Sequence, residues 1–162
     1  MVELLVAVLI MGVGVLGISA MQMISLQNNR GALLRAEAVQ LGYDMLDRIR
    51  ANPAGAVPGQ AYDGLDIGDA PPAAGDCFAN ACTQAQMVDF DQAVWKCSLG
   101  DFNDNADCIA YRAGVLPPED RAPGLPEGDG SIDVDANGII TVRVQWQEPN
   151  GPLRFITLES QG

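Results

Sequence analysis

The sequence is 162 residues long, contains no histidine and has a formal net charge of −12 at pH 7. Of its 21 acidic and 9 basic residues, four of each precede residue 53, which leaves 17 acidic and 5 basic residues after it. Such an acidic region repels phosphate backbones, so we expect no nucleic-acid partner. The lack of histidine excludes a Ser-His-Asp triad, no Walker loop is present, and no pair of acids stands out as glycosidase carboxylates. We therefore expect neither an enzyme nor a cofactor.

The first predicted element is a long α-helix that opens with an apolar segment, residues 4–21, just after Glu3. The only polar side chain in this segment is Ser19. At 1.5 Å per residue the segment would form roughly 27 Å of helix, close to the hydrocarbon thickness of a bilayer. An amphipathic part follows, with an apolar stripe at helical spacing formed by Leu34, Ala38, Leu41, Met45 and Ile49. Asn52-Pro53 disfavours helical geometry, so we predict a helix over residues 1–52, with a membrane-spanning or fibre-core half (4–21) and an amphipathic half (22–52).

Two features of the apolar segment leave alternatives open. Glu3 is either a solvated helix end or, in an assembly of such helices, a buried carboxylate that pairs with the amino terminus of a neighbouring subunit. Gly12, Gly14 and Gly17 form a GxGxxG pattern, but it lies within a continuous apolar helix rather than after a strand, and the nearest later acid is at position 37, so a dinucleotide site is not expected. Glycines in such a helix are more typical of close helix packing or of a local bend.

Residues 53–162 are predicted to form one globular head. The head opens with a Gly- and Pro-rich stretch, residues 53–76, which indicates irregular loops. Four cysteines follow, and an even number in an exported head favours disulfides and an oxidising compartment. The local pairs Cys77 with Cys82 and Cys97 with Cys108 are the simplest of the three possible connectivities. Zinc is the alternative, but the spacings are not those of zinc sites and no histidine is present, so we expect no metal there.

The remaining elements of the head follow in chain order. Residues 83–95 are predicted to form a short helix with Trp95 in the core. Two stretches resemble calcium loops, but residues 101–107 lack the required glycine and both lack the closing glutamate, so neither is an EF-hand. An irregular calcium site at 101–107 stays open, whereas residues 133–138 are better interpreted as a turn. Alternation over residues 140–146 and two flanking strands at 131–135 and 153–158 predict an antiparallel meander.

The amino-terminal sequence resembles the type IV pilins and, more narrowly, the minor pilins called PilV, the type IV pilus modification proteins. The resemblance rests on VELLVAVLIMGVGVLGISAMQ and its continuation through Asn29, Leu34, Arg35, Ala38, Tyr43, Asp44, Asp47, Arg48, Arg50 and Ala51-Asn52-Pro53. The segment LPEGDGSI (125–132) and Gln145-Trp146 extend it towards the carboxy terminus. The helix proline of many major pilins is missing here.

The resemblance implies an α+β fold of the type IV pilin class, in which a long N-terminal α-helix packs on a small antiparallel β-sheet with disulfide-stapled loops. Glu3 would set the register between subunits. The membrane and fibre-core helix would include Leu4, Leu5, Val8, Leu9, Gly12, Gly14, Leu16 and Gly17. Family members are cut after a short basic leader and N-methylated. We expect such a leader before Met1, because the basic residues after the apolar segment would otherwise favour a cytoplasmic head.

The expected function is that of a minor pilin in a priming or tip complex that initiates pilus assembly, in support of adhesion and twitching motility. Its partners would be other minor pilins, the major pilin and the inner membrane, and a tip adhesin is a further partner that the resemblance allows. The head would lie in the periplasm and later on the pilus at the cell surface. A minor pseudopilin of a type II secretion system and a head-mediated adhesive binding protein are the alternatives.

Overall fold

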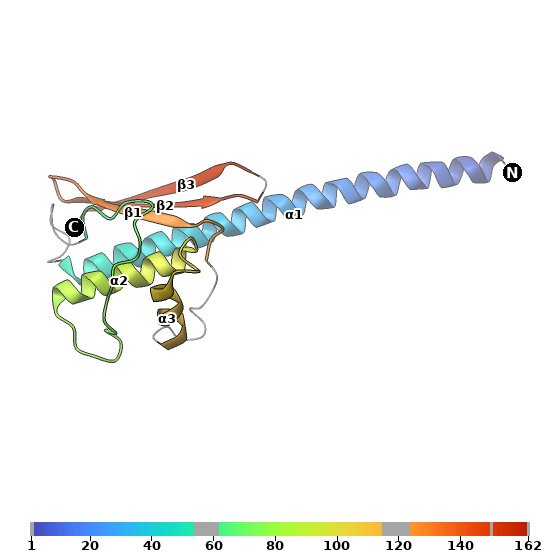
Figure 1. Ribbon diagram of the computed structural model, residues 1–162. Helices are drawn as coiled ribbons and strands as arrows, with labels where there is room; N and C mark the ends of the chain where they lie inside the picture. The colour runs from blue at the N-terminus through green and yellow to red at the C-terminus, as the bar shows by residue number, and fades with distance from the viewer. Residues whose placement is uncertain (1, 54–61, 115–123, 150, 162) are drawn as a thin grey trace. The chain divides into compact units, whose positions relative to one another are not determined.

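The structure is a computed structural model that describes residues 2–53, 62–114, 124–149 and 151–161. Its helices are α1 (Val2–Ala51), α2 (Gln84–Leu99) and α3 (Ala106–Gly114), and its strands are β1 (Asp129–Val134), β2 (Ile139–Gln147) and β3 (Leu153–Gln161) (Figure 1). The chain forms two compact units, one that ends at Arg35 and one that begins at Ala36. Helix α1 is continuous through both, so the head contains the distal part of this helix.

Helix α1 ends at Ala51, directly before Asn52-Pro53. The backbone N–H of Asn52 donates to the carbonyls of Arg48 and Ile49, at 3.2 and 3.1 Å, and Pro53 has no N–H with which to continue the helix. Of the predicted apolar stripe, Ala38, Met45 and Ile49 are buried in the head. Gly42 and Leu46 are buried beside them. The stripe is therefore the face that the helix presents to the core.

Helix α2 begins with a capping box. The Thr83 side chain accepts a hydrogen bond from the backbone N–H of Gln86, and the Gln86 side chain accepts one from the backbone N–H of Thr83. The helix runs beyond Trp95 to Leu99 and stops at Gly100, whose φ of 127° suits glycine best. The helix therefore starts where the sequence predicts it and is one turn longer at its carboxy-terminal end.

The third helix, α3, begins at Ala106, at the end of the stretch (101–107) that resembles a calcium loop. Asn105, one of the potential oxygen ligands, instead accepts hydrogen bonds through Oδ1 from the backbone N–H groups of Asp107 and Cys108, at 2.8 and 3.4 Å. This is the role of a helix N-cap. Asn and Asp serve calcium loops and helix caps through the same side-chain oxygen, so their spacing alone did not reveal α3.

The sheet is an antiparallel meander in the order β1-β2-β3. Alternate residues of β2 are buried as expected, namely Ile140, Val142, Val144 and Trp146. Between β1 and β2 the chain turns at Asp135, whose Oδ1 accepts from the N–H groups of Asn137 and Ile139, both at 2.8 Å. The hydrogen bond from Ile139, followed by those from Asn137, lowers the pKa of the Asp135 carboxyl. The second calcium-like stretch is thus a turn.

Trp95 of α2 lies in the core, between the sheet and α1. Its side chain is fully buried, and its indole N–H donates to the carbonyl of Leu41 in α1 at 2.9 Å. Two glycines allow this close packing. A Cβ at Gly130 of β1 would lie 2.4 Å from the Trp95 ring, and one at Gly42 of α1 would lie 2.7 Å from Leu158 of β3. The missing side chains let helix and sheet approach each other.

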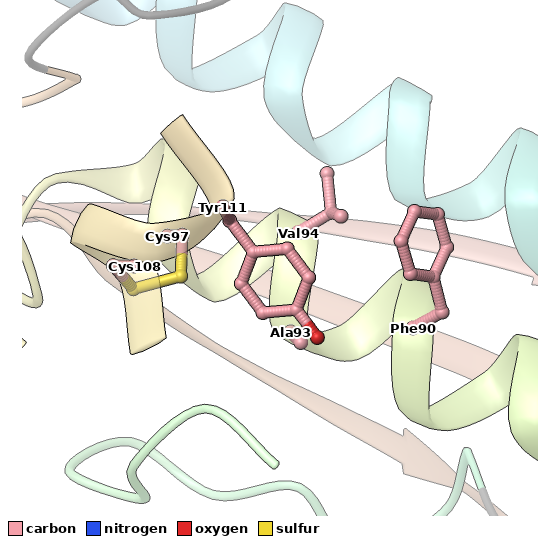
Figure 2. Packing of buried hydrophobic residues seen from close by; sticks show 6 residues of the cluster. All are labelled: Phe90, Ala93, Val94, Cys97, Cys108 and Tyr111. Carbon is pink, nitrogen blue, oxygen red and sulfur yellow. A yellow bond between two sulfur atoms is a disulfide. The ribbon is translucent and has the colours of Figure 1, made fainter. Parts of the chain in front are cut away.

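A second cluster lies where α2 packs on α3. It consists of Phe90, Ala93, Val94, Cys97, Cys108 and Tyr111, and all six side chains are buried (Figure 2). The Cys97–Cys108 disulfide lies inside the cluster and joins the two helices. Cys77 and Cys82 form the second disulfide of the structure. Both local cysteine pairs are therefore disulfide-bonded in the structure.

Candidate assembly surface

The helical unit that ends at Arg35 exposes an unusual amount of apolar side chain. Between Val2 and Met21 its large hydrophobic residues are at least half exposed, namely Val2, Leu4, Leu5, Val6, Val8, Leu9, Ile10, Met11, Val13, Val15, Leu16, Ile18 and Met21. Among the described residues, one helix, α1, is long enough and apolar enough to cross a membrane. A contiguous apolar surface of this kind marks a membrane or protein interface.

The one polar side chain in the apolar segment is satisfied within the helix. The Ser19 hydroxyl donates to the carbonyl of Val15, one turn earlier, at 2.9 Å. Polar groups in hydrocarbon are costly unless they are hydrogen-bonded. Ser19 therefore needs neither water nor a partner helix, and it leaves the segment suited to an apolar environment.

The three glycines of this segment do not interrupt the helix. α1 is helical through Gly12, Gly14 and Gly17, and a Cβ at any of them would meet no other described atom within 4 Å. Their small size is thus not required by packing within the described chain. It leaves flat places on the helix surface at which another helix can approach closely.

Glu3 lies in the first turn of α1, where the positive end of the helix dipole favours a carboxylate. No described Lys or Arg lies within ion-pair distance of it in this chain. The carboxylate is therefore available for a cation from outside the described residues, such as an amino terminus.

In the head, the distal part of α1 is tied to α2 by a buried carboxylate. Arg48 donates from Nη1 to Asp91 at 3.1 Å and from Nε to Asp44 at 2.8 Å. The Tyr62 hydroxyl donates to the other oxygen of Asp91 at 2.6 Å. Asp91 is only 5% exposed, so this network joins α1, α2 and the segment at Tyr62 under partial exclusion of water.

This network predicts a pH dependence of stability. Burial, and then the hydrogen bond to Asp91, raise the pKa of the Tyr62 hydroxyl well above its ordinary value. Above about pH 10 the unfolded chain therefore loses this proton while the folded chain keeps it, and the free energy of unfolding falls as the pH rises. Urea denaturation at pH 9 and pH 11 should show this fall. Tyr62→Phe should weaken it, and an equal fall in both proteins would contradict the assignment.

A fully buried ion pair lies deeper in the head. Lys96 of α2 contacts Asp129 of β1 with Nζ and Oδ1 at 2.7 Å, and Nζ also donates to the carbonyl of Asp66 at 2.7 Å. Asp129 accepts further hydrogen bonds from the backbone N–H groups of Gly68 and Gly130, at 2.6 and 2.7 Å. The pair therefore connects α2, the sheet and the loop around Asp66.

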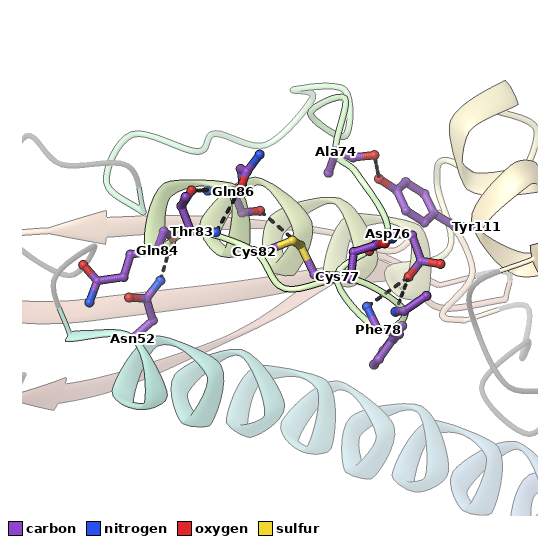
Figure 3. Close-up of a disulfide and its surroundings, with 12 residues drawn as sticks. Asn52, Ala74, Asp76, Cys77, Phe78, Cys82, Thr83, Gln84, Gln86 and Tyr111 are labelled. Carbon is purple, nitrogen blue, oxygen red and sulfur yellow. Dashed lines mark hydrogen bonds between the residues drawn. A yellow bond between two sulfur atoms is a disulfide. The ribbon is translucent and has the colours of Figure 1, made fainter.

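The half-buried Cys77–Cys82 disulfide closes a loop that carries an exposed phenylalanine. Asp76 accepts from the backbone N–H groups of Phe78 and Ala79, and Cys77 and Cys82 close the loop behind them (Figure 3). Phe78 is 59% exposed, and its ring packs edge-on against Phe90 with the centroids 5.0 Å apart.

Within the described residues no group of three His, Cys, Asp or Glu side chains could hold a metal ion.

No motif in the sequence points to Lys96, Asp129, Asp91 or Tyr62. A weak signal existed for Lys96, because it is a lone cation inside the apolar run Ala93, Val94, Trp95, Cys97. Lys96 and its partner Asp129 are 33 residues apart in the sequence, and Tyr62 and its partner Asp91 are 29 residues apart. No local periodicity links residues so far apart, so only the folded chain shows these pairs.

Comparison with known proteins agrees with this architecture. The model of the Tt1218-like family, described as type IV pilin Tt1218, matches residues 20–93, which include the distal part of α1 and the first part of α2. Searches of curated proteins and of solved structures found no match. The long amino-terminal helix, the small antiparallel sheet and the two disulfides form the type IV pilin fold, and the family match supports a type IV pilin.

Proposed function

We propose that this chain is a PilV-like minor pilin that joins a priming or tip complex with other minor pilins and the major pilin. The observation that carries the proposal is the exposed apolar part of α1 on a chain with the type IV pilin fold. A surface this apolar is stable in a bilayer or against other apolar helices. The same residues can therefore hold the subunit in the inner membrane and later form the core of a fibre.

In this proposal Leu4, Leu5, Val8, Leu9 and Leu16 provide apolar packing, and the exposed Gly12, Gly14 and Gly17 allow neighbouring helices to approach. Glu3 selects the register, because a carboxylate among apolar helices is costly until it meets a cation. The head, with its two disulfides, suits the oxidising periplasm before it reaches the cell surface. Its acidic surface supports protein partners rather than nucleic acid.

The Glu3→Ala variant tests the register role. We expect its amount in sheared surface fibres to fall about tenfold, because an interfacial ion pair is lost and the apolar helix then has no preferred register. Its amount in the membrane fraction should stay unchanged. Both amounts are read by quantitative peptide mass spectrometry, normalised to the major pilin.

Glu37→Ala is the matched control, since it removes a carboxylate from the same helix outside the apolar segment. It should leave incorporation unchanged. Normal incorporation of Glu3→Ala would contradict the register role.

The abundance of the native protein separates a minor pilin from a pseudopilin. A native protein found at trace level beside the major pilin supports a minor pilin. A protein that is confined to the membrane, and whose loss blocks secretion rather than piliation, would indicate a pseudopilin.

A further inference from the structure

The outer face of the sheet combines an aromatic side chain with a cation. The register pairs Gln145 with Phe155 and Arg143 with Thr157, so these residues share one face of β2 and β3. The guanidinium carbon of Arg143 lies 4.2 Å from the centroid of the Phe155 ring. Phe155 and Leu153 of the same face are 58% and 51% exposed. An arginine is thus held over an apolar patch that faces solvent.

Arg143 differs from the other cations that the structure describes from Ala36 onward. Arg48, Arg50, Lys96 and Arg154 each contact a carboxylate, and Arg112 donates to the Cys97 carbonyl. The backbone of Arg143 belongs to the strand pairs of β2, but its side chain has no hydrogen bond or ion pair with any described residue, and its Nε is buried without an acceptor. Thr157 is the cross-strand neighbour of Arg143, and Glu159 lies two residues beyond it on the same face, but Glu159 forms no ion pair with Arg143. Buried donors of this kind are normally satisfied.

A guanidinium that is stacked on a ring keeps its N–H groups free around its edge, in the geometry that binds a carboxylate through two hydrogen bonds. Arg143 is also a cation in a head with a large excess of acids. The buried Nε is closed to a ligand, but the terminal Nη groups are not among the buried atoms and have no acceptor among the described residues. They are therefore where a carboxylate from outside the described chain can bind, and the exposed Phe155 and Leu153 offer apolar contact beside them.

The edge of the sheet indicates the shape of the partner. β3 pairs with β2 on one side, and no strand in the described ranges pairs with its other side. Such an edge can align an extended peptide through backbone hydrogen bonds. A segment along β3 would bring its side chains close to Phe155 and the guanidinium stacked upon it.

A second copy of the chain fits this edge poorly in antiparallel pairing. Two β3 strands paired antiparallel would be related by a two-fold axis. In the head α1 and β3 run in the same direction, since Gly42 lies beside Leu158 and, further along both elements, Arg50 donates to Ser160 (Figure 1). The distal parts of two α1 helices would then point in opposite directions. Subunits that enter one membrane from the same side cannot adopt this arrangement, an argument that rests on the proposed function.

We propose that this face, defined by Arg143, Leu153 and Phe155, binds an extended segment of another protein that presents a carboxylate to Arg143 and an apolar side chain to Phe155. The probe is a labelled peptide with the 9-residue length of β3, in which threonine and valine alternate around one central glutamate. A twin peptide has glutamine in its place. Binding to the full chain in detergent micelles is measured by fluorescence anisotropy.

The glutamate peptide should bind about tenfold more tightly than its glutamine twin, because only the carboxylate forms charge-assisted hydrogen bonds with Arg143. Arg143→Gln should abolish this difference, and Phe155→Ser should weaken both peptides. Arg154→Gln, a nearby β3 cation that already pairs with Glu148, should leave the difference unchanged. Circular dichroism verifies that each variant is folded. If Arg143→Gln does not fold, Arg143→Lys replaces it; this variant keeps the charge but loses the planar guanidinium, and it should reduce the difference between the two peptides.

Absence of binding, equal affinity for the two peptides, or an Arg143→Gln protein that still prefers glutamate would overturn the proposal. These results do not depend on fibre formation. They are therefore distinguishable from a failure of the pilin function, which the incorporation of Glu3→Ala measures separately.

Discussion

The Lys96→Met variant is expected to lose about 3–5 kcal/mol of unfolding free energy, because it leaves a buried carboxylate without its cation. Lys96 and Asp129 have side-chain exposures of 0% and 3%, and their charged atoms lie 2.7 Å apart. Methionine preserves most of the side-chain volume, so the expected loss comes from the charge and its hydrogen bonds. It also removes the bond from Nζ to the Asp66 carbonyl.

Urea unfolding of the full chain in detergent micelles, followed by tryptophan fluorescence with the disulfides intact, measures this effect. Arg154→Met is the matched control, since Arg154 contacts Glu148 at 3.3 Å but is 55% exposed. An exposed pair of this kind contributes less than about 1 kcal/mol. Adding Asp129→Asn to Lys96→Met should recover part of the loss, because a neutral amide still accepts from the N–H groups of Gly68 and Gly130. A Lys96→Met protein as stable as the control would refute the structural role of the pair.

The second large effect concerns the disulfide between α2 and α3. We expect that replacing both Cys97 and Cys108 by alanine costs about 3–5 kcal/mol, whereas replacing Cys77 and Cys82 costs about 2 kcal/mol. The two bonds span sequence separations of 11 and 5, so the loss of chain entropy differs little between them. The difference comes from packing: Cys97 and Cys108 are fully buried beside Phe90 and Tyr111, and smaller side chains would leave a cavity there.

The two double-alanine variants are compared under the same urea conditions, and each serves as the control for the other. Far-UV circular dichroism should show that both remain helical in water. If the variant that lacks the Cys77–Cys82 bond were the less stable protein, the core between α2 and α3 would not be the main site of stabilisation.

These expectations separate stability from assembly. The pairs Lys96 with Asp129 and Cys97 with Cys108 lie inside the head and should affect its unfolding. Glu3 is exposed on the apolar part of α1, and Arg143 lies on the outer face of the sheet, so their changes should affect binding rather than folding. A loss of fibre incorporation without a loss of stability would therefore point to the helix or the outer face.

The sequence by itself determined the elements whose signals are local. Apolar spacing along α1, the Asn52-Pro53 stop, the start of α2 at Thr83 and the alternation of Ile140, Val142, Val144 and Trp146 each reflect a backbone period or a cap. The sequence also placed Trp95 in the core. These features depend on residues a few positions apart, and the chain therefore displays them before it folds.

Only the tertiary structure decided which distant side chains meet. Lys96 and Asp129 become a pair because α2 packs on β1, and the glycines at 42 and 130 matter because Leu158 and Trp95 approach them from other elements. Arg143 stands out because every other described cation of the head finds an acceptor while its own guanidinium lies over Phe155. Such contacts arise from packing between elements, and the periodicity of a single element carries no information about them.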